Sequence, residues 1–82
     1  MSHLPQDLHD IFPADAALLR QLKAEDRHFQ TLSARYADLD AHVHRIEGEQ
    51  EPATDAALED LKKARLAVLD DIAATLAQRR AA

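Results

Sequence analysis

The chain has no cysteine or tryptophan, and it contains one glycine, three prolines and three aromatic residues among its 82 residues. Without cysteine it can form neither disulfides nor thiolate metal sites, which fits a reducing compartment. The shortage of glycine and proline, together with many Ala, Leu, Glu, Lys, Arg and Asp residues, favours helix over sheet. The composition therefore predicts an all-α protein.

Long apolar segments are also missing. No run approaches the ~20 residues that a membrane-spanning helix needs. The first residues, MSHLPQDLHD, carry acids and histidines where a signal peptide has basic residues and then an apolar stretch. We expect a soluble cytoplasmic protein that does not associate with membranes.

The formal net charge is −5, and no segment has an excess of basic residues. Because proteins that bind phosphate backbones normally carry such an excess, nucleic acid is an unfavoured partner.

Apolar residues large enough to build a core are few. Seventeen of the 38 hydrophobic residues are alanine. A single domain over 1–82 with so few larger side chains is near the lower limit for folding alone. We therefore expect self-association, with a homodimer as the simplest form.

Two heptad rows of apolar residues run through the first half of the chain. They alternate by four and three, as positions a and d of a coiled coil do, and Glu25 interrupts one row. The rows comprise Leu22, Phe29, Tyr36 and Val43, and Leu18, Leu32, Leu39 and Ile46. No glycine or proline falls between Asp15 and Glu47, so we predict one continuous helix over 14–47.

The segment 48–54 is predicted to be a turn. Gly48 suits a helix C-cap that needs positive φ, Pro52 disfavours continued helix, and Thr54 or Asp55 can cap the next helix. That helix is predicted over 55–79, and its apolar face consists of Leu58, Leu61, Val68, Leu69, Ile72 and Leu76. A short connection favours an antiparallel, coiled-coil-like two-helix hairpin.

The N-terminal segment 1–13 contains a small apolar cluster. Leu4, Leu8, Ile11 and Phe12 predict a helical turn from about Pro5 to Ile11 that docks on the hairpin. The second helix is ~12 Å shorter than the first, so part of the first helix is left uncovered within one chain. We therefore expect two hairpins to pair through the seam into a four-helix arrangement.

Three segments of the chain, IFPADAALLRQLKAEDRHF, LSARYADLDAHVHRIE and LEDLKKARLAVLDDI, resemble the YdcH-like family of short bacterial proteins. The resemblance extends from Leu8 to Leu76. Its most specific pieces are Leu22-Lys23, Asp26, His28-Phe29, Leu39-Asp40, Ile46-Glu47, Leu61-Lys62-Lys63, Arg65-Leu66 and Asp70-Asp71-Ile72. Two positions depart from the family pattern, because Tyr36 stands where histidine is common and Leu69 replaces a frequent lysine. The resemblance implies a small cytosolic helical hairpin with no catalytic residues to transfer.

Two pairs of residues that include histidine have spacings that bear on metal binding. His42 and His44 are two residues apart, so on a helix they point in nearly opposite directions, and we interpret them as solvent-facing. Glu25 and His28 have the Glu-x-x-His spacing of di-iron bundles, which places both side chains on one helix face. One such motif supplies an incomplete ligand set, so these two residues are candidate metal ligands only, and no metal or other cofactor is expected.

Lys62, Lys63 and Arg65 form the one basic cluster. Acidic residues flank it, so intrahelical ion pairs such as Glu59 with Lys63 explain it, and contact with nucleic acid is the alternative.

No candidate nucleophile has a plausible general base and a group to orient that base, and no glycine-rich phosphate loop is present. We therefore expect neither enzymatic activity nor a small-molecule substrate. The sequence favours a small protein–protein interaction or adaptor protein whose partner it does not identify, with nucleic-acid association through the basic cluster as the alternative.

Overall fold

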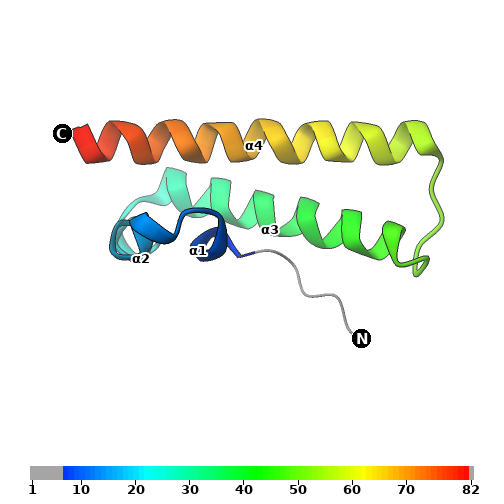
Figure 1. The fold of residues 1–82 in the computed structure, drawn as a ribbon, viewed down its shortest axis with the longest axis horizontal. Coiled ribbons are helices and arrows are strands. Elements are labelled where there is room, and N and C mark those ends of the chain that lie inside the picture. The colour runs from blue at the N-terminus through cyan, green and yellow to red at the C-terminus, as the bar shows by residue number, and fades with distance from the viewer. Residues whose placement is uncertain (1–6, 82) are drawn as a thin grey trace.

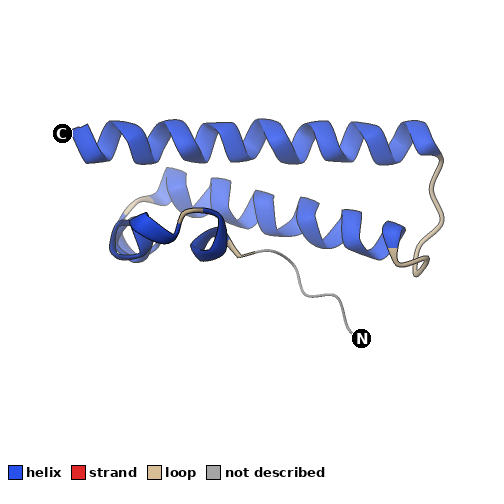
Figure 2. Cartoon of the chain, viewed as in Figure 1, coloured by secondary structure: helices blue, strands red, loops and turns tan. Residues whose placement is uncertain are grey.

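The computed structural model describes residues 7–81, and every regular element within that range is helical. The elements are α1 (Leu8–Ile11), the 3₁₀ turn η1 (Pro13–Asp15), α2 (Ala16–Glu25), α3 (Arg27–Glu47) and α4 (Asp55–Ala81). The prediction of an all-α protein is thus confirmed for the described residues (Figure 2). Leu4 and Pro5, which belong to the predicted N-terminal turn, lie outside them.

The long helices α3 and α4 lie side by side and are joined at one end by residues 48–54 (Figure 1). The short N-terminal elements α1, η1 and α2 gather at the opposite end, near the C-terminus of α4 (Figure 1). The helix pair therefore has a third layer of structure over only part of its length.

The predicted continuous helix over 14–47 is wrong, because the chain leaves the helical conformation at Asp26. This residue is extended, with φ −110° and ψ 109°, and its Oδ1 accepts a hydrogen bond from the backbone N–H of Phe29 at 3.0 Å. Aspartate is one of the best N-cap residues, since its carboxylate satisfies an N–H that the first helical turn leaves unpaired. Gln30 bridges the break by donating from its side chain to the carbonyl of Lys23 at 2.8 Å. A favourable cap therefore outweighs the heptad pattern that runs across this position.

The connection to α4 differs from the prediction in one detail. Gly48 has φ −84°, and the positive φ of 61° belongs to Glu49. Gly48 is instead constrained by space, because a Cβ there would lie 3.1 Å from the carbonyl oxygen of His44. Thr54 caps α4 as predicted, since its Oγ1 accepts from the N–H of Ala57 at 3.1 Å. The helix then begins at Asp55 and continues two residues beyond its predicted end, to Ala81.

The core lies where all three layers meet. Its best-buried side chains come from α2, α3 and α4, and the fully buried apolar ones are Leu19, Leu22, Phe29, Ile72 and Leu76. Leu8 of α1 joins them with 3% of its surface exposed. Towards the 48–54 loop Val43 of α3 is also fully buried but lies outside this cluster, and Leu58 and Leu61 of α4 are only half-buried.

Candidate functional site

A groove of about 560 Å³ runs between α3 and α4 on the half of the helix pair near the loop. We call it the α3–α4 groove. One stripe of α3 and one stripe of α4 form its walls, and Ile11 of α1 contributes to one end. Its lining residues are Tyr36, Asp40, His44 and Glu47 from α3, Lys62, Arg65, Leu66 and Leu69 from α4, and Ile11.

Asp40 is the most deeply buried polar residue of the groove, with 1% of its surface exposed. Arg65 of α4 donates from Nη1 to its Oδ1 at 2.8 Å. His44, one turn further along α3, places Nδ1 3.5 Å from the same oxygen and donates to the Asp40 backbone carbonyl at 2.7 Å. Burying a carboxylate is costly unless it is paired and hydrogen-bonded, and these two neighbours supply the pairing. The Asp40–Arg65 pair therefore ties the two long helices together at the middle of the groove.

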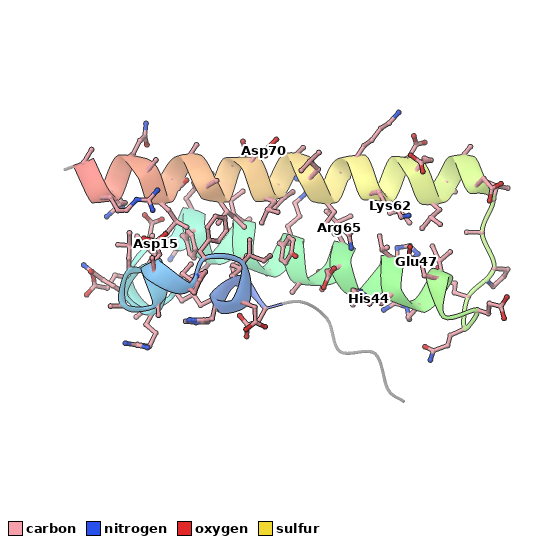
Figure 3. All side chains as sticks on the ribbon, in the orientation of Figure 1. Asp15, His44, Glu47, Lys62, Arg65 and Asp70 are labelled. Carbon is pink, nitrogen blue, oxygen red and sulfur yellow. The ribbon has the colours of Figure 1, made fainter. Side chains whose placement is uncertain are left out.

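A second ion pair lies towards the loop, where Lys62 Nζ is 3.1 Å from Glu47 Oε2 (Figure 3). The hydrogen bond from Lys62 is the main cause that lowers the pKa of Glu47 below its ordinary value. Both side chains are more than one-third exposed, so solvent screens this pair strongly. It therefore adds little to the stability of the fold and leaves this part of the groove wall without net charge.

Tyr36 forms the apolar side of the groove beside Leu69. Burial is the main cause that raises the pKa of its phenol, the nearby Asp40 carboxylate adds to the rise, and Arg65 opposes it. Because the sequence contains only this tyrosine, its ionisation reports directly on the charges of the groove.

The predicted basic cluster is divided by the fold. Lys62 and Arg65 turn towards α3 and pair with Glu47 and Asp40, while Lys63 is exposed. The expectation of intrahelical pairs is therefore wrong for the two paired cations, whose partners lie on α3. Helical geometry explains the division, since residues 62 and 65 share a face and residue 63 is turned ~100° from 62.

The two candidate metal ligands lie on different helices. Glu25 ends α2 and His28 is in the first turn of α3, so the break at Asp26 removes the shared helix face on which the metal interpretation depended. Both side chains are exposed, and Gln21 donates to Glu25 at 3.3 Å. Glu25 therefore does not occupy the seam. Among residues 7–81 there is no group of three or more potential ligands placed to hold a metal ion.

The sequence predicted that His42 and His44, near the end of α3, face solvent, but both contact acidic side chains. His42 pairs with Glu51 in the loop, and this contact is the main cause that lowers the pKa of Glu51. His44 has a side chain only 15% exposed and contacts Asp40. The two rings do point to different partners, as their two-residue spacing predicts.

All fourteen residues of the predicted seam are buried or half-buried within the single chain. The buried ones are Leu22, Phe29, Leu32, Tyr36, Val43, Val68, Ile72 and Leu76, and the half-buried ones are Leu18, Leu39, Ile46, Leu58, Leu61 and Leu69. By contrast, Leu66 is 58% exposed, the one large hydrophobic residue among those described that stands in solvent. The seam is thus largely used within the chain, and Leu66 marks the exposed apolar edge of the groove.

A second set of ion pairs fixes the N-terminal elements to the last turn of α4. Arg80 donates to the buried carboxylate of Asp15 at 2.9 Å, and Arg79 donates to Asp26. The pKa of Asp26 is lowered mainly by the hydrogen bond from the Phe29 N–H, with Arg79 contributing. Sequence reasoning missed Asp15, Asp40 and both arginines, because long-range pairs leave no periodic signal.

The described residues thus form an all-helical protein with a groove between two long helices, and no described helix is long and apolar enough to cross a membrane. The family model for a protein of unknown function, DUF465, matches residues 29–76, and the chain belongs to that family. The matched range covers α3 from its third residue, the loop and most of α4, and α3 and α4 are the helices that form the groove walls. A search of curated proteins found no match, and a search of solved structures found none.

Proposed function

We propose that this protein is a small, non-enzymatic protein–protein interaction or adaptor module that binds a protein segment in the α3–α4 groove. The observation that carries the proposal is Leu66, an exposed leucine at the edge of a groove that also presents Leu69 and Ile11. Apolar side chains beside a groove between two helices suit the apolar face of an incoming helix. The acidic and basic groups of the same groove are already paired, so they add little net charge to the binding surface.

The hydrogen bonds of three threonine hydroxyls support a non-enzymatic role. Thr31 donates to the carbonyl of Arg27, Thr75 donates to the carbonyl of Asp71, and Thr54 caps α4. A catalytic hydroxyl needs a base that removes its proton, whereas these three groups bond to the backbone of their own helices.

The alternative, nucleic-acid binding through the basic cluster, is less favoured by the geometry. Lys62 and Arg65 each have a carboxylate partner, which leaves Lys63 as the one cation of the cluster without an ion pair among residues 7–81. Since phosphate binding grows with the number of cations free to displace counterions, one such lysine supports only a small contribution.

Within this proposal, α3 and α4 act as a coiled-coil-like antiparallel hairpin, and the protein works in the cytoplasm. The resemblance to YdcH-like proteins supports both points, since it implies a small cytosolic helical hairpin. The family match over 29–76 is consistent with that resemblance.

The test is site-specific photo-cross-linking in the natural host, with the cross-linking residue placed at Leu66 and, as a matched control, at Ala67. Both positions are exposed on α4, but residue 67 is turned ~100° away from the groove. We expect a defined protein adduct, resistant to nuclease, from position 66 and not from 67. Equal adducts from both positions, or adducts that nuclease removes, would contradict the proposal.

A further inference from the structure

We infer that the occupant of the α3–α4 groove is a second copy of this chain, docked about a two-fold axis so that Leu66 of each copy packs into the groove of the other. The inference rests on the proposed function, because it takes the groove to be a protein-binding surface. It moves the expected homodimer interface from the heptad seam, which is buried within one chain, to a different face of the molecule.

The uneven third layer is the first reason. Near the C-terminus of α4, the N-terminal elements pack over the helix pair, and Ile72 and Leu76 are fully buried there. Near the loop, the groove takes the place of that layer, and Leu58 and Leu61 are half-buried. A second helix pair laid on this half would supply the missing layer and extend a core that is small for one chain.

The shape of the groove edge is the second reason. A two-fold interface uses the same patch on both copies, so the patch must contain both a protruding and a receiving part. Leu66 protrudes, with 58% of its surface exposed. Tyr36, Leu69 and Ile11 line the hollow beside it and can receive an apolar side chain. One patch thus provides both parts.

The third reason is charge. Asp40 pairs with Arg65 and Glu47 pairs with Lys62, so the carboxylates lining the groove are each matched by a cation. Two copies that each carry a net charge of −5 repel one another less when they meet through this groove than through a surface of unpaired acids. An acidic peptide or a nucleic acid would instead require free cations in the groove.

The residues one turn on either side of Leu66 add complementarity. Lys62 precedes it by four positions and Asp70 follows it by four, so all three lie along one stripe of α4. When two α4 helices pack antiparallel with their Leu66 side chains at the centre, Lys62 of one copy lies opposite Asp70 of the other. Asp70 is exposed and makes no ion pair within the described part of the chain, so it is free to take this role.

Sedimentation equilibrium over a wide range of concentrations tests the inference. We expect the unmodified protein to approach twice its chain mass of 9.1 kDa. Leu66→Asp should raise the dimer dissociation constant by about a hundredfold or more, because it buries a charge in an apolar contact. Ala67→Asp, which introduces the same charge on the adjacent outer face, should leave the dimer intact.

A second matched pair tests the register of the two copies. Asp70→Lys should raise the dissociation constant by up to about tenfold through two symmetric rim contacts, whereas Asp71→Lys should not. Circular dichroism confirms that each variant remains folded. A dimer that survives Leu66→Asp, or an unmodified protein that is monomeric throughout, would overturn the inference. If the protein is monomeric but still cross-links another protein from position 66, the proposed function stands and only the dimer is refuted. If it is monomeric and position 66 gives no specific protein adduct, both the dimer and the proposed function are refuted.

Discussion

Replacing Arg65 by methionine should destabilise this protein more than any other single change in its charged surface. The substitution keeps the length of the aliphatic stem but removes the guanidinium that donates to Asp40 at 2.8 Å. The carboxylate it leaves behind has 1% of its surface exposed and cannot turn towards water. The penalty is therefore the cost of a buried charge that has lost its main partner.

The expected magnitude follows from which partner is removed. Breaking a buried pair at one end costs about 3–5 kcal/mol, and His44 near the same carboxylate places the value at the lower end, about 3 kcal/mol. Asp40→Asn should cost less, because Arg65 has a side chain 28% exposed and can extend into solvent. In Asp40→Asn/Arg65→Met neither charge remains unpaired, so the double variant should be more stable than Arg65→Met alone.

Urea denaturation of the four proteins, followed by circular dichroism, measures this cycle. All four are compared at one protein concentration, because the proposed dimer would make the apparent stability depend on concentration. Thermal melts should show the Arg65→Met loss of about 3 kcal/mol as about 12–24 °C, at about 4–8 °C per kcal/mol for a chain of this size. Lys63→Met is the matched control, because Lys63 is exposed, and it should stay within about 0.5 kcal/mol of the unmodified protein. Equal losses of unfolding free energy in Arg65→Met and Lys63→Met would show that the buried Asp40 carboxylate does not need Arg65 as its partner.

Further expected outcomes concern single residues. Tyr36 should ionise above pH 10.0 in a spectrophotometric titration, and Asp40→Asn should lower that pKa by removing a nearby negative charge; an unchanged titration would place the phenol in water. Asp26→Ala should lower the melting temperature more than Asp26→Asn, because asparagine retains an oxygen that accepts from the Phe29 N–H, and equal losses would show that the cap is unimportant. Glu47 has a lowered pKa in the folded state, so its contribution to the free energy of unfolding is present above pH 4.5 and is lost as the pH falls through the lowered pKa. Glu47→Gln should therefore flatten the dependence of the unfolding free energy on pH in that range. An unaltered slope would contradict the pairing of Glu47 with Lys62. Ile72→Ala should cost about 2–5 kcal/mol because the side chain is fully buried, and a loss below 1 kcal/mol in chemical denaturation would contradict its place in the core.

The sequence predicted the all-helical content well, because composition and periodicity are local signals. It did not predict the break at Asp26, where the heptad pattern favours continued helix and the capping preference of aspartate favours a new helix start, and the cap prevails. The groove was missed for a related reason. Asp40 falls one residue after a seam position and reads as a surface charge, and its burial becomes evident only when Arg65 of α4 lies beside it. The pieces of sequence that carry the family resemblance include Asp40, Glu47 and both of their cationic partners, but they give no indication that these residues pair.

Four of the five cations of α4 reach acids on other elements, with Lys62 and Arg65 contacting α3 and Arg79 and Arg80 contacting Asp26 and Asp15. These contacts hold the helix at two places, beside the groove and at its last turn. They also leave Lys63 as the one cation of α4 without an ion pair among the described residues. The exposed surface of α4 is consequently acidic, with Glu59, Asp60, Asp70 and Asp71. A partner approaching α4 thus meets acidic side chains on its outer surface and, at the edge of the groove, the apolar side chain of Leu66. This contrast supports the proposal that the partner presents an apolar surface and not a phosphate backbone, and it makes substitution of Leu66 the most direct test of that proposal.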